Sequence, residues 1–486
     1  MSYDKMEEDF RVSVRPDGDN TNGGLFAWNV TSAGVDRSNQ DDAYVDFSSG
    51  SSSGVTATTQ TGSDWYNRRR IVLSGYDVSA DDIGNVFTID SDSGSSLYEG
   101  SYLIMSVDTT ANYWQAQQNL RSSGGDSVAE TVTGKMGGAL ADPFFYRSKM
   151  QVWYNHGYMF NIYLKAGTYT CTSGNELDSS GITYMPYGEK WIGYTTTVGD
   201  HNDGGARPII DVPSSLNYSG TVLDLPTSWS SSATFLEIRG GGKATKGIHI
   251  GNYNNTAYLC VVKDCGGTGS GYPTGFYGTG VAIACHAEDC VYGYFYNIIS
   301  KDCSARDCTY GWYLNYSKDI CINCIADTCS TAGILAGGDS CNTINTVAYN
   351  CSNVGIELTN RAQAIGCGAH SCGKGFSIDS YAGAVIDSWV YNNTTNFYSG
   401  ADDYQNVNCQ TLTADPFEDA SSGDFRLNSA AAGGALLAGE SSPHGAGQTG
   451  TSYGDINAFV TEPSGSSGGG TTVPQGLHSI ESGINA

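Results

Sequence analysis

The sequence predicts an all-β fold: a right-handed parallel β-helix with an N-terminal antiparallel β domain and a C-terminal tail. Two observations lead to this prediction, namely the composition of the chain and a cysteine-containing segment that recurs about every 21 residues. Of 486 residues, 64 are glycine, 32 are tyrosine and only 15% are charged. This composition favours many short strands joined by tight turns, and the chain is longer than a single compact core usually allows.

The repeat is marked by cysteines, thirteen of which lie between residues 260 and 372. Six segments aligned on their last residue read CVVKDC, CHAEDC, CSARDC, CIADTC, TVAYNC and CGAHSC, ending at Cys265, Cys290, Cys308, Cys329, Cys351 and Cys372. WVYNNT continues the series, with Asn393 in the cysteine position. A glycine and an apolar run follow most of these segments, as at Gly293 and Gly311. Periods of this length are typical of stacked supersecondary units.

Each unit contains short β runs and no helical spacing of apolar residues, which predicts a coil of three short strands. Successive coils lie ~4.8 Å apart, so equivalent residues stack in columns. Cysteine is small and readily buried, and we expect it to fill tight corners as a free thiol. Disulfides and a metal site are the alternatives. A reducing compartment and an odd number of cysteines argue against disulfides. The one C-x-x-C pair, Cys321 and Cys324, has no second pair to complete a zinc site. We therefore expect no metal and no cofactor.

The coils divide the chain into four parts. Residues 1–141 are predicted to form a β-rich domain that caps the first coil or attaches it to a partner, since an open coil end exposes unpaired backbone edges. Residues 142–415 are assigned to the β-helix and 416–462 to a closing segment. Residues 463–486 are a Gly/Ser-rich linker with a terminal peptide.

Four stretches carry a resemblance to known proteins. FNIYLKAGTYTC, at 160–171, is an apolar strand followed by AGTY and resembles the opening coil of pectate-lyase-like β-helix proteins. The run from 189 to 211, with GYTTTVGD and RPIID, is similar to early coils of β-helix proteins encoded by tailed phages and found in environmental bacterial sequences. Residues 11–47 and the stretch from 414 to 440 resemble the same group. The likeness covers most of residues 11–462 and implies the architecture, but no reaction is assigned to the group.

The charge of the chain limits its partners. Fifty acidic and 24 basic residues give a formal net charge of −26, which repels nucleic acids and anionic membranes. The N-terminus MSYDKMEEDF lacks the basic and apolar regions of a Sec signal. With the resemblance, these features predict a phage virion protein that is assembled in the host cytoplasm and displayed on the particle as a decoration, fibre or spike component. Its expected partners are capsid or tail proteins, further copies of itself as a homo-oligomer, and surface polysaccharide, without nucleic acid or membrane insertion.

Aromatic side chains are crowded on two successive coils. Alternation along the strands places about half of them outward, and the candidates for contacting a glycan or a protein partner are Tyr292, Tyr294, Tyr296, Tyr310, Trp312 and Tyr316. Outward aromatic rings can stack on sugars or form an interface. Simple shielding of the sheet is the alternative.

A second interpretation is a polysaccharide depolymerase of the tailspike kind, either a glycoside hydrolase or a lyase, and a third is a bacterial surface adhesin. Hydrolysis requires two carboxyl groups, ~5 Å apart for retention or ~6.5 to 9.5 Å for inversion. The repeat places Asp289 and Asp307 one coil apart, and Glu288 and Asp327 two coils apart with Arg306 between them, hence ~5 and ~10 Å. Acidic residues at turns also have a local hydrogen-bonding role. The main interpretation therefore assigns no catalytic residue, and these five belong to the alternative alone.

Overall fold

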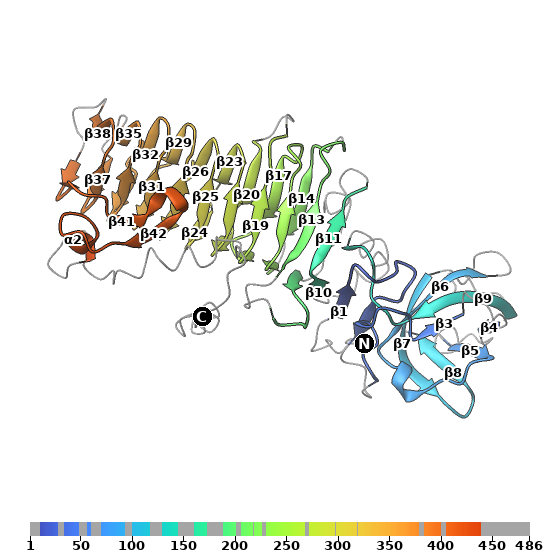
Figure 1. The fold of residues 1–486 in the computed structure, drawn as a ribbon. Helices are drawn as coiled ribbons and strands as arrows, with labels where there is room; N and C mark the ends of the chain where they lie inside the picture. Colours follow the sequence, from blue (N-terminus) through green and yellow to red (C-terminus); the bar gives the residue numbers. More distant parts are fainter. Residues whose placement is uncertain are drawn as a thin grey trace.

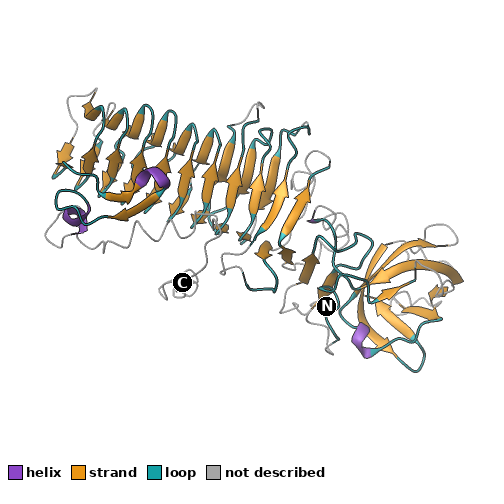
Figure 2. Cartoon of the chain, in the orientation of Figure 1, coloured by secondary structure: helices purple, strands orange, loops and turns teal. Residues whose placement is uncertain are grey.

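Three parallel β-sheets wind around one long axis, and a small β-barrel lies at the N-terminal end (Figure 1). The structure, a computed structural model, describes residues 10–27, 34–47, 56–59, 70–92, 100–116, 129–143, 160–172, 188–200, 206–216, 218–225, 230–267, 272–296, 298–317, 319–378, 383–399 and 405–438. Strands dominate these residues, and helices are few and short (Figure 2). The prediction of an all-β parallel β-helix with an N-terminal antiparallel domain is confirmed.

The three sheets are the walls of the β-helix. In order along the axis, wall 1 contains β2 (Leu25–Ala27), β1 (Phe10–Val14), β10 (Phe160–Lys165), β12 (Glu189–Tyr194), β15 (Ser232–Thr234), β18 (Thr256–Tyr258), β21 (Val281–Ile283), β24 (Ile299–Lys301), β27 (Ile320–Ile322), β30 (Asn342–Ile344), β33 (Gln363–Ile365), β36 (Ala384–Ile386) and β39 (Gln405–Val407). Wall 2 contains β11 (Gly167–Thr170), β13 (Pro208–Asp211), β16 (Glu237–Arg239), β19 (Val261–Lys263), β22 (His286–Glu288), β25 (Ser304–Arg306), β28 (Ile325–Asp327), β31 (Val347–Tyr349), β34 (Gly368–His370), β37 (Trp389–Tyr391) and β40 (Gln410–Thr411). Wall 3 contains β14 (Thr221–Leu225), β17 (Lys246–Ile250), β20 (Thr274–Gly278), β23 (Tyr292–Phe295), β26 (Tyr310–Leu314), β29 (Ala332–Ala336), β32 (Val354–Leu358), β35 (Lys374–Ile378) and β38 (Thr395–Ser399).

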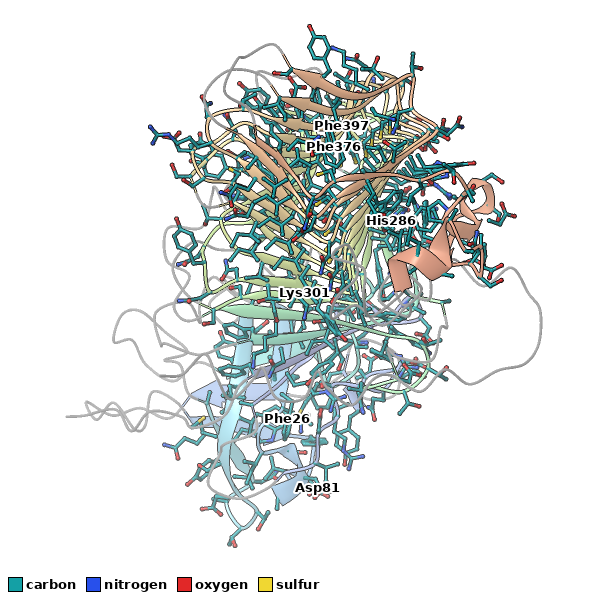
Figure 3. All side chains as sticks on the ribbon, turned by 90° about the vertical axis from the view of Figure 1, so that its left-hand side faces the viewer. Phe26, Asp81, His286, Lys301, Phe376 and Phe397 are labelled. Atoms are coloured by element: carbon teal, nitrogen blue, oxygen red, sulfur yellow. The ribbon has the colours of Figure 1, made fainter. Side chains whose placement is uncertain are left out.

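The core is a set of columns, because the strands of each wall pair in parallel from one coil to the next; β2, at the edge of wall 1, alone among the described wall strands pairs antiparallel, with β1. The inward column of wall 3 is aromatic at Phe276, Tyr294 and Trp312, whose successive ring centroids are 4.9 and 4.7 Å apart with nearly parallel planes. The same column ends at Phe376 and Phe397, which lie inside the coil in the view along the axis (Figure 3). Stacked rings of this kind add packing energy beyond their buried area.

Left-handed residues form the bends on both sides of wall 2. The bend from wall 1 to wall 2 has a positive φ at Leu259, Ala284, Asp302, Asn323, Asn345, Gly366, Asp387 and Asn408. The bend from wall 2 to wall 3 has a positive φ at Asp264, Asp289, Asp307, Thr328, Asn350, Ser371 and Asn392. Asn and Asp tolerate this conformation better than other residues with a Cβ atom, which explains why these columns are rich in them.

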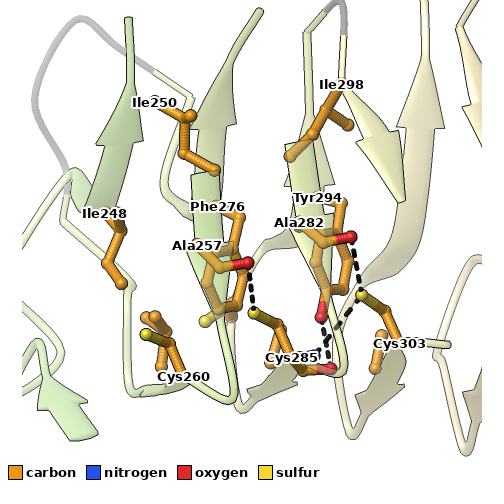
Figure 4. Packing of buried hydrophobic residues seen from close by; sticks show 14 of the residues in the cluster. Ile248, Ile250, Ala257, Cys260, Phe276, Ala282, Cys285, Tyr294, Ile298 and Cys303 are labelled. Atoms are coloured by element: carbon orange, nitrogen blue, oxygen red, sulfur yellow. Dashed lines mark hydrogen bonds between the residues drawn. The ribbon is translucent and has the colours of Figure 1, made fainter. Parts of the chain in front are cut away.

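A small side chain follows the left-handed residue and points inward. The fourteen cysteines from Cys260 to Cys409 are free thiols, and all but Cys409 are buried. The thiols sit against backbone groups of their own coil and the previous one: Cys285 Sγ lies 3.4 Å from the carbonyl oxygen of Ala257, and Cys303 Sγ lies 3.4 Å from that of Ala282 (Figure 4). The spacing of five between paired cysteines is therefore the length of chain between the two bends that flank wall 2.

Other polar residues take the same place where cysteine is absent. The Cys324 amide donates to Thr346 Oγ1 at 3.4 Å, as the Cys285 amide does to a thiol of the next coil. The Cys372 amide donates to Asn393 Oδ1 at 2.7 Å, and Asn393 Nδ2 donates to the Ala369 carbonyl oxygen at 2.9 Å. A small side chain that satisfies a backbone group of a neighbouring coil is thus what the position requires.

The repeat glycines mark the closest approach of walls 2 and 3. A Cβ atom on Gly293 would lie 2.5 Å from the carbonyl oxygen of Gly311 and 3.0 Å from Ala305 Cβ. An alanine in place of Gly293 would therefore clash with the backbone of the next coil. The glycine column and the alanine column of wall 2 pack against each other because neither carries a larger side chain.

The N-terminal domain is a closed antiparallel barrel. Its strands are β3 (Val45–Asp46), β4 (Thr56–Thr59), β5 (Arg70–Ser74), β6 (Val86–Asp92), β7 (Gly100–Asp108), β8 (Tyr113–Ala116) and β9 (Ala129–Met136), with a short 3-10 helix, η3 (Ala80–Asp82). The sheet closes because β9 pairs with both β4 and β6. Asp82 is buried beside the core; its carboxylate accepts hydrogen bonds from Tyr76 Oη at 2.9 Å and Trp114 Nε1 at 2.8 Å.

The first strand of the chain belongs to the β-helix and not to the barrel. β1 pairs in parallel with β10, so that Phe10 lies opposite Phe160. The barrel is therefore inserted between the first and second rungs of wall 1, whereas the sequence placed the whole of residues 1–141 in a separate domain. About 145 residues separate the two paired strands, so their pairing leaves no trace in the local repeat.

The C-terminal segment, residues 412–438, folds back over the outer surface of wall 2. It contains β41 (Phe417–Asp419), the 3-10 helix η6 (Ala420–Ser422), β42 (Asp424–Leu427) and α2 (Gly434–Ala438). Leu412, Phe417, Ala420, Phe425 and Leu437 form a buried cluster with Ile325, Val347 and Trp389 of wall 2. Residues 416–438 fall in the predicted closing segment, 416–462; the rest of that segment and the predicted linker and terminal peptide lie outside the described residues.

Candidate functional site

Wall 3 carries an outward-facing group of rings on β20, β23 and β26, which we call the aromatic face. Its members are Tyr272, Tyr277, Tyr292, Phe295, Tyr296, Tyr310, Tyr313 and Tyr316. They form two parallel columns, because Tyr292 pairs with Tyr310, and Phe295 pairs with Tyr313 in the strand register. Rings that would be isolated on a single strand are thereby brought together from three coils.

The rings of the aromatic face stack along the axis. The ring centroids of Tyr292 and Tyr310 are 5.2 Å apart with planes 8° from parallel, and those of Phe295 and Tyr313 are 5.1 Å apart, also at 8°. Tyr277 extends the second column, 5.8 Å from Phe295. The two columns also touch, since Tyr292 lies 5.5 Å from Tyr313. The result is a continuous, rigid ring surface.

Solvent reaches the edges of this surface. Tyr272 is 55% exposed and Tyr316 is 39% exposed, while Tyr292, Tyr310 and Tyr313 are half-buried. The hydroxyl-bearing residues at the edge also contact each other: the ring centroids of Tyr296 and Tyr316 are 4.3 Å apart. An extended ligand can therefore contact the outward edges of the stacked rings without any rearrangement of the core.

Two of the six aromatic candidates from the sequence do not belong to this surface. Tyr294 and Trp312 are fully buried inside the coil, and the Tyr294 hydroxyl donates to the carbonyl oxygen of Cys285 at 2.8 Å. Strict alternation fails at the repeat glycine: Gly293 and Tyr294 both point inward, because the chain bends there against wall 2. Tyr292, Tyr296, Tyr310 and Tyr316 lie on the aromatic face.

Sequence analysis missed Tyr272, Tyr277, Phe295 and Tyr313 as members of the site. The signal that identifies three of them is their position, since each is the second residue after a repeat glycine. In this register the first residue after the glycine points inward and the second points outward, as Trp312 and Tyr313 show.

Charged and polar groups border the aromatic face on the N-terminal side. The Lys246 ammonium lies 3.7 Å from the centroid of the Tyr277 ring. His249 stacks obliquely on the same ring at 5.3 Å, and its Nδ1 is 2.7 Å from Asp224 Oδ1. Burial raises the pKa of Tyr277, and also that of Tyr292. The phenols therefore stay protonated and available as hydrogen-bond donors at neutral pH.

A second cluster, made of charged residues, lies on the outer surface of wall 2. The strand register places Glu288 opposite Arg306, and Arg306 opposite Asp327. Lys263 Nζ is 3.0 Å from Glu288 Oε2, and Arg306 Nε is 2.9 Å from Asp327 Oδ2. Glu288 and Asp327, two of the carboxylates predicted for the alternative, enzymatic interpretation, are thus each held by their own cation. The guanidinium group lies between the two carboxylates in the register.

The two carboxylates have opposite pKa shifts. Burial raises the pKa of Asp327, which is 6% exposed, despite the Arg306 guanidinium beside it. For Glu288, burial acts in the same direction, but the hydrogen bond and charge of Lys263, together with His286 and Arg306, outweigh it, so that its pKa is lowered. His286, also on β22, is buried and its pKa falls to about 4, mainly because burial disfavours the imidazolium. A raised and a lowered carboxyl pKa are what acid–base catalysis requires.

Asp289 and Asp307 have a local structural role. Both are left-handed bend residues, with φ values of 52° and 53°. Thr328 of the next coil donates a hydrogen bond from Oγ1 to Asp307 Oδ1 at 2.6 Å. Burial and the nearby Glu288 raise the pKa of Asp289. The bend conformation alone is enough to explain an aspartate at each position.

Among the described residues, no three His, Cys, Asp or Glu side chains come together as a metal site requires. In the same part of the chain, no helix is long and apolar enough to cross a membrane.

The solved structures that match this chain resemble it in fold. A scan against protein-family models gave no match, and a search of curated proteins gave none. Solved structures that match include ORF18 of Geobacillus virus E2, with a TM-score of 0.35, 14% identity, and coverage of 55% of this chain and 56% of that chain. A tailspike protein mutant of E. coli bacteriophage HK620, in complex with a hexasaccharide, has a TM-score of 0.38 and 10% identity, covering 56% of this chain and 63% of that one.

A third match, the A-module of a mannuronan C-5 epimerase from Azotobacter vinelandii, has a TM-score of 0.35 and 11% identity, covering 56% of this chain and 96% of that one. Against the two phage proteins, this chain spans less than two thirds of their length. At these identities the likeness concerns the β-helix architecture.

Proposed function

We propose that this chain is a structural protein of a phage virion, displayed on the particle surface as a decoration, fibre or spike component, and that it binds surface polysaccharide through the aromatic face. Its further partners are capsid or tail proteins. The observation that carries the glycan proposal is the stacked array of Tyr292, Tyr310 and Tyr313 with Phe295. The three tyrosines are partly open to solvent, and Phe295 is buried among them.

The chemistry of the aromatic face suits a sugar chain. Aromatic rings present an apolar body, and tyrosine adds a polar hydroxyl at its edge, which matches the apolar C–H faces and hydroxyl rims of a pyranose. Three coils at ~4.8 Å spacing give a surface about 10 Å long between the first and last ring, enough for two sugar units. Lys246, next to Tyr277, adds a positive charge at one end that would favour an acidic sugar.

The virion assignment is supported by sequence. Residues 11–47 and 414–440 resemble the terminal parts of β-helix proteins of tailed phages. Among the described residues of these stretches, β1 pairs with β10 at the start of wall 1, and residues 414–438 lie on the outer surface of wall 2.

Cleavage of the bound polysaccharide is the second candidate function. It is favoured by one specific observation, the opposite pKa shifts of Glu288 and Asp327. It is opposed by Arg306, which neutralises the buried Asp327 and stands between the two carboxyl groups in the register. We therefore propose binding without cleavage.

The test is binding of the full chain to a panel of purified bacterial surface polysaccharides. For any polysaccharide that binds, the double variant Tyr292→Ala/Tyr310→Ala is expected to bind at least about tenfold more weakly, equivalent to about 1.4 kcal/mol. Tyr398→Ala is the matched control, because Tyr398 is an exposed tyrosine on the same wall, on β38, away from the aromatic face. Equal affinity of the double variant and the control would contradict the proposal.

The same incubation separates binding from cleavage. The length of the polysaccharide after prolonged contact with the chain is expected to be unchanged. Shortening that is lost in Glu288→Gln and Asp327→Asn, while affinity is retained, would instead establish the depolymerase.

A further inference from the structure

Wall 1 carries an apolar ladder on its outer surface. In the column that ends each strand, β21 contributes Ile283, and the following strands contribute Lys301, Ile322, Ile344, Ile365, Ile386 and Val407. These side chains point outward, because the middle residue of each strand, such as Ala282 or Cys321, is buried in the core. We call the column from Ile283 to Val407 the isoleucine ladder.

A second outward column adds apolar surface beside the ladder. Val281, Ile299 and Ile320 pair in register at the start of β21, β24 and β27. Ile299 is 38% exposed and Val407 is 46% exposed; the ladder isoleucines are half-buried, and none belongs to a buried cluster among the described residues. Contiguous apolar surface of this extent marks an interaction site.

The neighbouring wall shows what such a surface normally requires. On wall 2, the outward Ile325, Val347 and Trp389 are covered by the C-terminal segment and are buried. The described part of the chain provides no corresponding cover for the isoleucine ladder.

We propose that the isoleucine ladder is the interface through which this chain binds a second copy of itself. The first argument is charge. The chain has 50 acidic residues against 24 basic ones, so two copies repel each other over most of their surface. Between β21 and β36, the described outward positions of wall 1 contain one charged residue, Lys301, and it pairs with Asp302 on the adjacent bend at 3.8 Å. Two copies can therefore approach each other on this wall without opposing carboxylates.

The second argument is the match of spacing. Side chains of the ladder recur at the coil spacing of ~4.8 Å, and another copy presents the same repeat. Isoleucines of one copy can then fit between those of the other over the whole length. An interface made from one patch meeting itself is the isologous contact that closed oligomers use.

The third argument is extent. From Ile283 to Val407 the ladder crosses six steps of the β-helix, about 29 Å at ~4.8 Å per step. A standard interface buries about 800 Å² per partner, which corresponds to a square about 28 Å on a side. The isoleucine ladder is therefore about as long as one side of an interface of standard size.

The test is the molar mass of the full chain by size-exclusion chromatography with light scattering, over a range of concentrations. The unmodified chain is expected to give a multiple of the mass of one chain. Ile344→Lys, in the centre of the ladder, is expected to shift the dissociation constant upward by at least tenfold and to give the mass of one chain at low concentration. Ile209→Lys is the matched control, since Ile209 is a half-buried outward residue of wall 2, on β13.

Circular dichroism and the melting temperature establish that each variant is folded. If Ile344→Lys fails to fold, Ile344→Thr keeps the β-branched shape that strands favour and is expected to raise the dissociation constant by a smaller amount. A single-chain mass for the unmodified protein overturns the proposal. So does an unchanged assembly of a folded ladder variant.

Discussion

At the scale of the residue, the β-helix depends on a pair of neighbours: a left-handed residue followed by a small side chain that fills the bend. Asp302 and Cys303 form such a pair in one coil, as do Asn323 and Cys324 in the next. A leucine in the second place would overfill a site that already contacts backbone on two sides, at a cost of about 1 to 3 kcal/mol. The pair is therefore a requirement of backbone geometry, and cysteine is one of several residues that satisfy it.

Because every cysteine except Cys409 is buried, the thiols are expected to react slowly with reagents in the folded chain. Burial raises the pKa of Cys367 to about 12 and that of Cys341 to about 11, so neither forms the reactive thiolate at neutral pH. Cys409 is the exception in exposure, being half-buried. A thiol reagent at pH 7.5 should modify one site per chain rapidly, and Cys409→Ser should remove that reaction.

Unfolding in denaturant without reductant should release the remaining thiols for modification. A total below the fifteen cysteines of the sequence would show that some of them form disulfides. Rapid modification of several sites in the native chain would contradict the buried columns.

At the scale of the element, the sequence predicts the strands well and their contacts in part. The recurring cysteines and glycines predict the length of the coil, and they predict that Asn393 occupies the cysteine column. They do so because each of these positions accepts only a small side chain for local steric reasons. Alternation does not predict that Tyr294 and Trp312 point inward, since the bend at the glycine changes the phase of the strand. The pairing of Glu288, Arg306 and Asp327 in register follows from the repeat, but the burial of Asp327 comes from tertiary packing that has no periodic signal.

The connection from β26 to β27 contains a carboxyl group that opposes folding at neutral pH. Asp319 is 2% exposed and accepts a hydrogen bond from the Tyr316 amide at 3.1 Å. Burial raises its pKa to about 7. The folded state therefore binds the proton more tightly than the unfolded state, and the free energy of unfolding falls as the pH rises from about 4 to about 7.

Asp319→Asn should remove this dependence. Because three pKa units correspond to about 4 kcal/mol, the variant is expected to be more stable than the unmodified chain by up to that amount at pH 8, and by less at pH 5. Urea unfolding at both pH values measures the difference. An equal gain in stability at both pH values would mean that the asparagine acts through packing, and that the protonation of Asp319 is not the cause.

At the scale of the whole molecule, each coil is stabilised mainly by contacts with its two neighbours, as in other solenoids. Walls 1 and 2 also have apolar outer surfaces that need a cover. Wall 2 is covered from within the chain: Phe417 is 2% exposed, with its ring 5.7 Å from that of Trp389 and 5.3 Å from that of Phe425. This contact joins the end of the chain to the last coils. The interface proposed for wall 1 would provide the corresponding cover from a second copy.

Phe417→Ala is expected to loosen the C-terminal segment while the β-helix remains folded. Truncating a buried phenylalanine costs about 3 to 5 kcal/mol, and the loss falls on the segment, since coils distant from it make no contact with it. Limited proteolysis should cleave residues 412–438 faster in the variant, with an apolar dye binding to the uncovered surface of wall 2. Leu427→Ala, at a partly buried position of the same segment, is the milder control. Cooperative unfolding of the entire chain would show instead that the segment is required for the β-helix.

The two columns of left-handed residues allow the molecule to change length in whole increments. Cys329 and Cys351 occupy the same place in successive coils, 22 residues apart, so excising the residues between such equivalent points rejoins matching bends. Each excision or duplication would shorten or extend the shaft by one strand spacing, while the parallel pairing within each wall and the bends between walls are retained. A chain built in this way can become longer when the part of the gene that encodes one coil is duplicated.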